Sequence, residues 1–405
     1  MTDGRAALVL TGGGARAAYQ VGALIAICDV WGRRAENPFP IICGTSAGAV
    51  NAVALAVFSA NFNEAVKKLA FIWRNFHVHH VYRADTLAIA ESVTRWGSAM
   101  FLGWLFRQSP RSLLDNQPLR ELLEAQLDFG AIGHAIADGH LQAVTVTASG
   151  YTSGESLSFF QGREDLQPWR RAQRVGVRTD IKVEHLLASS AIPFVFPAVR
   201  INREYFGDGS MRQTAPISPV IHLGADRILV IAGGRRSEEA RQRTDMYPSP
   251  AQVAGHAMSS IFLDGLSMDL ERLERINSTV GALTPAQREA AGIALRPIET
   301  FVIAPSQRLD YLAARHRNAL PRALRLVLGG IGATRKNGSV LLSYLLFERG
   351  YTRALMELGY QDAMSQREQL ARFLRVPAHS SAAALQVAQE RPSVTKKDSQ
   401  KTSKI

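Results

Sequence analysis

The sequence predicts an α/β fold in which a mostly parallel central sheet is flanked by helices on both faces, giving three α/β/α layers. The first observation behind this prediction is an apolar run at residues 6–10, closed by three glycines and followed by helical apolar spacing over 15–31. The second is a repeat of the same order, with an apolar run at 39–43, a small-residue turn and a helical stretch over 47–59. Consecutive strand–helix units of this kind form parallel sheets.

Later stretches continue the alternation of strand and helix. Residues 141–148 alternate between apolar and polar as a strand does, and residues 157–160 can pair beside them. Apolar spacing predicts the other elements: a strand or hairpin at 200–206, strands at 227–232 and 300–303, and helices at about 63–76, 117–128, 214–223, 261–276 and 339–358.

Composition divides the chain into three parts. Residues 5–235 hold most strand–helix units and every motif described below, so we predict one α/β domain there, with a mainly helical C-terminal section at 250–375 packed on it. From residue 377 the chain turns polar, and its last fifteen residues hold five basic side chains against one acid, Asp398. We expect residues 377–405 to form a disordered basic tail.

The composition indicates a folded protein without a disulfide scaffold. The chain has 405 residues, 46% of them hydrophobic, which supplies a core and argues against gross disorder and against a multi-span membrane protein. Cys28 and Cys43 lie in apolar stretches with no CxxC or Cys/His spacing, so neither a disulfide framework nor a zinc site is predicted. We expect no metal, no cofactor and a reducing compartment, the cytoplasm.

Two apolar stretches bear on membranes. Residues 41–60 approach spanning length but contain Asn51 and a polar turn at 44–48, so we interpret them as buried in protein and expect no transmembrane helix. The first residues show no signal peptide. Residues 96–106, between two arginines, suit either an interfacial or lid segment or a helix that covers the core.

The formal net charge of +12, from 47 basic and 35 acidic residues, favours an anionic partner. Together with the basic tail it predicts peripheral contact with an anionic membrane surface. The same charge would suit nucleic acid, but the sequence holds no recognisable nucleic-acid-binding motif, so no nucleic acid is expected.

The pentapeptide Gly44-Thr45-Ser46-Ala47-Gly48 matches G-x-S-x-G between a predicted strand and a predicted helix. The flanking Gly44 and Gly48 let the chain reverse sharply enough to expose the Ser46 hydroxyl at the strand end, where it can attack a carbonyl. This nucleophile elbow makes Ser46 the candidate nucleophile. The alternative is that the glycines only tighten the turn and Ser46 caps the helix.

A glycine loop, Gly12-Gly13-Gly14-Ala15-Arg16, occupies the same place in the preceding strand–helix unit. In a parallel sheet both turns lie at the carboxyl edge, so the backbone N–H groups of this loop can converge with Ser46 and hold an oxyanion. Arg16 can either hold the loop in shape or meet a phosphate group.

The same loop also fits a dinucleotide-binding fingerprint, as Gly12-x-Gly14-x-x-Ala17. That fingerprint requires an acid at the end of the second strand, whereas here the strand ends in Cys43 and Glu36 precedes it. Nucleotide binding through the Gly12 loop is therefore the less favoured alternative.

A general base for Ser46 is predicted at Asp208, in the turn 206–210 that directly follows a predicted strand. A carboxylate there can project toward the sheet edge, although an ordinary Asp-Gly turn explains the same pattern. A histidine base in the order Ser, Asp, His is the other possibility. None of the downstream histidines lies in a loop of catalytic character: His222, His256 and His316.

Taken together, these segments resemble the patatin-like phospholipases. The resemblance rests on four segments in that family's order and spacing: TGGGARAAYQVGAL, GTSAGAVNA, LASSAIPFVFPAV and FGDGSMRQTAPISPVIHLGADRILV. It covers about residues 5–375. Ala17 and Ser210 depart from the family's usual residues, and neither departure removes a catalytic group.

The resemblance implies a serine lipid acyl hydrolase with a Ser-Asp dyad, in which Ser46 is the nucleophile and Asp208 the base. Gly12, Gly13, Gly14 and Arg16 would form the oxyanion loop. Since an aspartate is a poor base at its usual pKa of about 3.9, burial has to raise its proton affinity. The expected substrates are acyl esters of phospholipids or lysophospholipids. The alternatives are a non-catalytic lipid-binding module on the same fold and a nucleotide-binding protein.

Overall fold

The computed structural model describes residues 5–83, 94, 112–235, 247–335 and 338–376. Within these residues, ten strands form one sheet in the order β10-β9-β1-β2-β3-β4-β6-β5, with β8 also paired to β3 and β7 paired to β8. The strands of its parallel part are β1 (Ala6–Leu10), β2 (Ile41–Thr45), β3 (Ala143–Gly150), β9 (Arg227–Ile231) and β10 (Glu299–Ile303).

The parallel strands β1 and β9, in the middle of the sheet, are buried on both sides because their sequences are mostly apolar. β1 reads AALVL and β9 reads RILVI, and every residue of both strands is buried. Successive side chains of β1 face opposite layers, so that Leu8 and Leu10 pack in one core while Ala7 and Val9 pack in the other.

Beyond β3 the sheet continues with both antiparallel and parallel strand pairs. β4 (Ser156–Gly162) runs antiparallel to β3, followed by β6 (Arg174–Arg178) and β5 (Trp169–Arg171). A hairpin of β7 (Val199–Ile201) and β8 (Glu204–Asp208) lies at the carboxyl end of β3, where β8 pairs with it. The end of β8 therefore lies at the same sheet edge as the end of β2.

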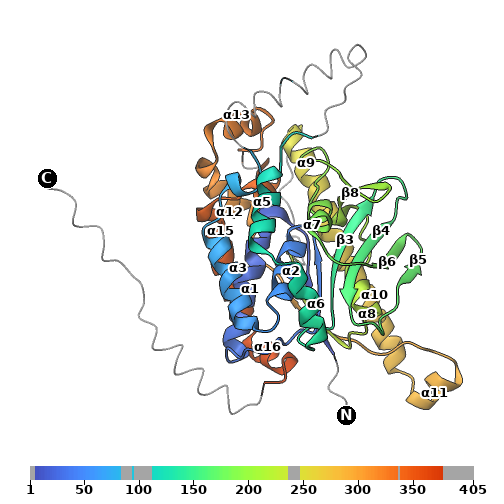
Figure 1. Ribbon diagram of the computed structural model, residues 1–405. Helices are drawn as coiled ribbons and strands as arrows, with labels where there is room; N and C mark the ends of the chain where they lie inside the picture. Colours follow the sequence, from blue (N-terminus) through green and yellow to red (C-terminus); the bar gives the residue numbers. More distant parts are fainter. Residues whose placement is uncertain (1–4, 84–93, 95–111, 236–246, 336–337, 377–405) are drawn as a thin grey trace.

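Helices cover both faces of the sheet, so the predicted three-layer class is confirmed (Figure 1). One face carries α1 (Ala18–Val30), α2 (Ala47–Val57), α3 (Phe62–Arg74) and α15 (Arg349–Ser365), and the other carries α8 (Ser218–His222) and α10 (Gly265–Gly281). The remaining described helices are α5 (Gln117–Gln126), α6 (Gly130–Ala137), α7 (Val183–Ser189), α9 (Pro250–Ser259), α11 (Pro285–Ala290), α12 (Leu309–Arg315), α13 (Arg322–Gly330), α14 (Ser339–Leu345) and α16 (Arg367–Phe373).

The first two strand–helix units match the prediction within a few residues. β2 begins at Ile41 rather than at Phe39, since Pro40 has no N–H to donate to a neighbouring strand. A short 3-10 helix, Gly14–Ala17, precedes α1 and takes up the start of the predicted helix.

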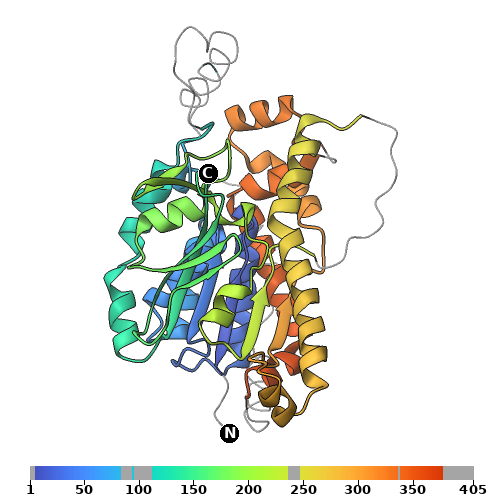
Figure 2. The same ribbon diagram turned by 90° about the vertical axis from the view of Figure 1, so that its right-hand side faces the viewer.

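Three later helices have other bounds than predicted. The stretch 214–223 is an α-helix only at α8, because Pro216 and Pro219 restrict its start. The stretch 261–276 is part of a longer run in which α9 and α10 join through a π-helical turn and follow the length of the sheet (Figure 2). The stretch 339–358 is two helices, α14 and α15.

The two predicted folded sections share one sheet. β10 comes from the section 250–375 and pairs with β9 of the section 5–235, and α15 packs against α1. The division between the sections stays a prediction. The predicted tail 377–405 and the segment 96–106 lie outside the described residues. Among the described helices, none is both long and apolar enough to cross a membrane.

α1 and α15 approach so closely that each presents a glycine to the backbone of the other. A methyl group at Gly22 would lie 1.9 Å from the carbonyl oxygen of Met356, and one at Gly359 would lie 2.0 Å from that of Tyr19. Both obstacles are backbone atoms, which cannot move aside as a flexible side chain can. The packing of this helical layer therefore depends on the two glycines.

We expect Gly22→Ala to lower the free energy of unfolding by about 1–3 kcal/mol, the usual cost of overpacking. The matched control is Gly281→Ala at the end of α10, where an added methyl group meets no atom within 4 Å. The control should keep or slightly raise stability, because alanine restricts the unfolded chain. Urea denaturation measures both variants, and equal stability of the two would contradict the packing described.

Candidate active site

Ser46 lies at the turn between β2 and α2, in a backbone conformation that few residues adopt. Its φ is 55° and its ψ is −133°, a strained combination for a residue with a side chain. Two glycines make room for the turn: a methyl group at Gly44 would lie 2.4 Å from Cα of Ala49, and one at Gly48 would lie 2.3 Å from the carbonyl oxygen of Leu10. The turn thus has the sharp shape that the motif predicts.

Ser189, the last residue of α7, supports this turn. Its hydroxyl accepts a hydrogen bond of 2.8 Å from the backbone N–H of Ser46 and donates one of 2.6 Å to the carbonyl oxygen of Thr147. The side chain is fully buried and connects the elbow to the end of β3. Ser189 is absent from the predicted site residues because only its place in the segment LASSAIPFVFPAV marks it in the sequence.

Asp208 ends β8 and meets Ser46 directly. The Ser46 hydroxyl donates a hydrogen bond of 2.6 Å to Oδ2 of Asp208, and Oδ1 accepts one of 2.9 Å from the backbone N–H of Ser210. The pairing of β8 with β3 brings the carboxylate to this edge. Gly209 is required beside it, because a methyl group there would lie 2.0 Å from the carbonyl oxygen of Thr147.

This Ser46–Asp208 pair is sealed from solvent. Ser46 has 1% and Asp208 has 0% of its surface exposed. Burial raises the pKa of Asp208 from 3.8 to about 6, although the hydrogen bonds from Ser46 and Ser210 act in the opposite direction. The carboxylate therefore has a higher proton affinity than a solvated aspartate, and it is still mostly ionised above pH 7.

The predicted oxyanion loop lies beside this pair. A methyl group at Gly12 would lie 2.4 Å from Oγ of Ser210, so the loop packs against the turn that follows Asp208. Gly14 has a φ of +54°, which favours glycine, and a methyl group there would lie 2.3 Å from the carbonyl oxygen of Tyr344. Gly14 and Ser46 line the same cavity.

The Arg16 side chain is buried against α14. Its guanidinium donates to Oγ of Ser343 at 2.9 and 2.7 Å and to the hydroxyl of Tyr344 at 3.0 Å, and it lies over the Tyr344 ring. Its backbone N–H donates to the carbonyl oxygen of Gly13. Of the two roles considered for Arg16, these contacts match holding the loop in shape and not contact with a phosphate group.

An apolar cavity of about 40 Å³ lies next to Ser46. Aromatic side chains form much of its wall: Trp73, Phe76, Phe196 and Phe347. This volume is far below the roughly 300–1,000 Å³ of typical ligand pockets. A ligand of ordinary size therefore fits beside Ser46 only if the cavity walls move.

A chain of buried hydrogen bonds connects the cavity wall to the glycine loop. Trp73 donates from its indole to Asn51 at 2.8 Å, and Asn51 donates to Gln20 at 2.9 Å. Gln20 in turn donates to the carbonyl oxygen of Thr11 at 2.7 Å. These hydrogen bonds thus connect Trp73 in the cavity wall to the backbone at the start of the glycine loop.

The three candidate histidines lie elsewhere. His222 ends α8 and stacks on Trp169, and because β9 follows it, it lies toward the amino edge of the parallel strands, opposite Ser46. Burial lowers the pKa of His222 to about 4. His256 is exposed on α9, and His316 follows α12. Within the described part of the chain, no histidine forms a hydrogen bond to the Ser46–Asp208 pair.

The site lies within the region that matches known proteins. A model of the patatin-like phospholipase family matches residues 8–221. A cGAMP-activated phospholipase of Pseudomonas aeruginosa is 28% identical over 217 residues, which are 52% of this chain and 53% of that protein. The matched part thus spans about half the length of this curated relative. Among solved structures, VipD from Legionella pneumophila shows 13% sequence identity and a TM-score of 0.35, over 91% of this chain and 67% of that one.

The raised pKa of Asp208 predicts a pH-dependent loss of stability. Its pKa of about 6 in the folded state exceeds 3.8, the value for a solvated side chain. The folded protein therefore binds this proton more tightly, so the stability that the proton contributes is present below about pH 4 and is lost as the pH rises through 6.

Asp208→Asn should therefore raise the free energy of unfolding by about 1–3 kcal/mol at pH 7.5 and change it little at pH 4. Urea denaturation at the two pH values measures this difference. Asp138→Asn, at an exposed position, is the control and should have no such effect. An Asp208→Asn variant that is no more stable than the wild type at pH 7.5 would show that the buried carboxylate is not destabilising.

Proposed function

Because the chain belongs to the patatin-like phospholipase family, we propose that it is a lipid acyl hydrolase that forms an acyl-enzyme on Ser46 with Asp208 as the base. The observation that carries this proposal is the buried hydrogen bond of 2.6 Å from the Ser46 hydroxyl to Asp208 at a strained turn. A nucleophile and a base within hydrogen-bond reach are what covalent catalysis requires.

In this proposal Asp208 accepts the proton that Ser46 loses. As the serine oxygen bonds to the ester carbonyl carbon, its proton passes along the existing hydrogen bond to Oδ2, and Asp208 then gives a proton to the leaving alcohol. Water attacks the acyl-enzyme next, with Asp208 taking the proton of the water and returning one to Ser46. A pKa of about 6 makes this carboxylate a stronger base than a solvated aspartate.

The glycine loop is the proposed oxyanion hole. Attack on the ester places negative charge on the carbonyl oxygen, and each preorganised donor to such an oxygen is typically worth about 2.7–4 kcal/mol. Gly12, Gly13 and Gly14 allow close approach of the substrate, and the helix that follows adds a favourable dipole. Arg16 acts as a positioning residue, because it anchors the loop to α14.

The cavity beside Ser46 supports a lipid ester as the substrate. Its apolar and aromatic walls suit an acyl chain, and the similarity to a relative named as a phospholipase favours phospholipids or lysophospholipids. The formal charge of +12 supports peripheral contact with an anionic membrane surface, where such substrates lie.

The surroundings of the glycine loop argue against the nucleotide-binding alternative. At Gly14 the loop faces the carbonyl oxygen of Tyr344, whose partial negative charge repels phosphate oxygens. The other alternative, a non-catalytic lipid-binding module, would keep its function without the hydroxyl of Ser46, so substitution of this residue separates the two.

We expect Ser46→Ala and Asp208→Asn each to lower fatty acid release from lipid esters by about a thousandfold or more, because one removes the nucleophile and the other the base. His222→Ala should change the rate by less than about tenfold, since a general base is worth about 10²–10⁴ and His222 is remote from the site. The assay measures fatty acid released from a panel of phospholipids and lysophospholipids.

Circular dichroism of each variant provides the control for folding. Loss of activity in a folded His222→Ala variant would indicate a Ser-Asp-His triad in place of the proposed dyad. Undiminished ester cleavage by Ser46→Ala would refute the proposed mechanism.

A further inference from the structure

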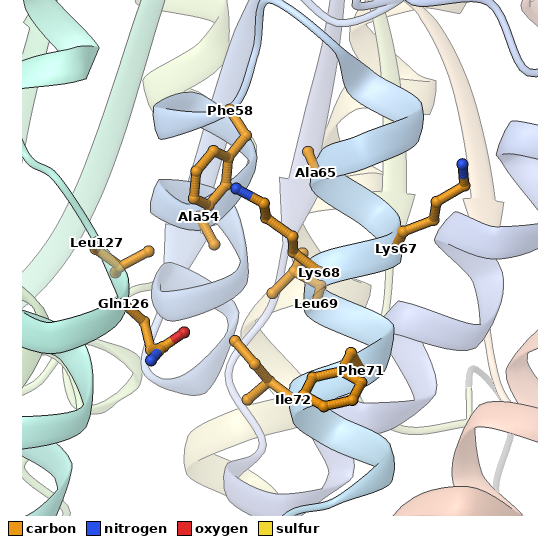
Figure 3. Close-up of a pocket in the computed structure, with 10 residues that line it drawn as sticks. All are labelled: Ala54, Phe58, Ala65, Lys67, Lys68, Leu69, Phe71, Ile72, Gln126 and Leu127. Carbon is orange, nitrogen blue, oxygen red and sulfur yellow. The ribbon is translucent and has the colours of Figure 1, made fainter.

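A second hollow lies on the outer surface of the helical layer, where α2, α3 and the end of α5 meet (Figure 3). It has a volume of about 330 Å³ and is open to solvent on one side, so it falls within the range of ligand pockets. We call it the α3 groove, and its walls include Ala54, Phe58, Lys68, Leu69, Ile72 and Leu127.

Two lysines line the α3 groove, and the ammonium of one of them faces its apolar walls. The ammonium of Lys68 lies 3.8 Å from the centre of the Phe58 ring, on the groove side of α3 (Figure 3). Its neighbour Lys67 also lines the groove, but the ammonium of Lys67 points to the other side of the helix and pairs with Glu64 at 2.8 Å. Among the described residues, Lys68 has no carboxylate partner. An anion held over the groove would therefore meet an ammonium that no carboxylate neutralises.

The groove and the cavity at Ser46 lie along the same helices. On α2, Ala47 and Val50 line the cavity, whereas Ala54 and Phe58, on the following turns, line the groove. α3 and α5 also contribute to both spaces. The two spaces share no lining residue, but they are neighbours, because Val50 of the cavity and Ala54 of the groove are about one helical turn, ~6 Å, apart on α2.

We propose that the α3 groove binds one fatty acid anion, with its hydrocarbon chain along the apolar walls and its carboxylate at Lys68. Both Lys67 and Lys68 line the groove, but Lys67 is paired with Glu64, so one cation is left to meet a ligand. A recess of this kind matches one amphiphile of single negative charge better than it matches a bilayer surface, which several protruding cations would favour. Fatty acid is also the product class of the proposed lipid hydrolysis. The choice of ligand rests on that proposed function, whereas the binding itself does not require Ser46 or Asp208.

The test is calorimetric titration of the full chain with dodecanoate, below its micelle-forming concentration, at pH 8. Wild type should bind dodecanoate, and Lys68→Met should bind it about tenfold or more weakly, because a charge-assisted hydrogen bond is lost while the apolar stem is kept. Lys67→Met is the matched control and should bind as the wild type does. Dodecanol should bind wild type and Lys68→Met equally.

A diazirine-bearing fatty acid locates the bound chain. We expect crosslinks in the peptides of α3 and the end of α5 that line the groove, and fewer of them in Lys68→Met. Crosslinks confined to the cavity at Ser46, or equal losses of affinity in the two lysine variants, would overturn the proposal. Binding only to phosphatidylglycerol vesicles, weakened equally in both variants, would identify the face as a membrane-docking surface and also overturn it.

These measurements separate this proposal from the enzymatic one. Lys68→Met should cleave a short-chain ester at the wild-type rate, because Lys68 lies outside the proposed catalytic machinery. If wild type cleaves no ester while dodecanoate binding still depends on Lys68, the proposed function fails and the groove site stands. If wild type cleaves esters and dodecanoate does not bind, the groove proposal fails and the proposed function stands.

Discussion

The backbone of Ser46 has to reverse direction between β2 and α2 at a positive φ, and the surrounding structure has to hold it there. Gly44 and Gly48 supply the space, since a methyl group at either position would collide with backbone atoms. Ser189 satisfies the N–H that the turn leaves inside the protein. Strain of this kind persists only where its surroundings over-determine it, and it gathers at sites of chemistry. The hydroxyl of Ser46 consequently meets Asp208 inside the protein, where Ser46 is almost fully buried.

The burial of the Asp208 carboxylate lowers the free energy of unfolding of the protein. Among the described residues the buried Asp208 carboxylate has no basic partner, so its burial is destabilising, and the hydrogen bonds from Ser46 and Ser210 offset part of that penalty. The apolar core, and helix contacts such as that between α1 and α15, have to supply the stability that offsets the rest of this penalty. The same penalty raises the proton affinity of the carboxylate, so what destabilises the fold is also what makes aspartate usable as a base.

Local patterns were enough to predict the sharp turn at Ser46 and the three-layer class, because strand, glycine turn and helix are short-range signals. They left Asp208 open between a base and an ordinary Asp-Gly turn, and the family resemblance, not the local pattern, pointed to a base. Ser189 escaped prediction because its role depends on α7 reaching the end of β3, a contact that no local spacing encodes. The direction of the Arg16 side chain likewise depends on Ser343 and Tyr344, far along the chain. The π-helical turn that joins α9 to α10, and the short strands β5 and β6, lack the long periodicity on which such predictions rest.

The most direct test of the account is the pH dependence with which a fluorophosphonate reacts at Ser46, followed by mass spectrometry of the intact and digested chain. Asp208 must be ionised to take the proton of the serine, so the account predicts a single adduct at Ser46 whose rate of formation rises with an apparent pKa near 6. That dependence should vanish, together with nearly all labelling, once residue 208 can no longer ionise. Labelling that is absent from folded protein, or that continues unchanged without the carboxylate, would contradict it.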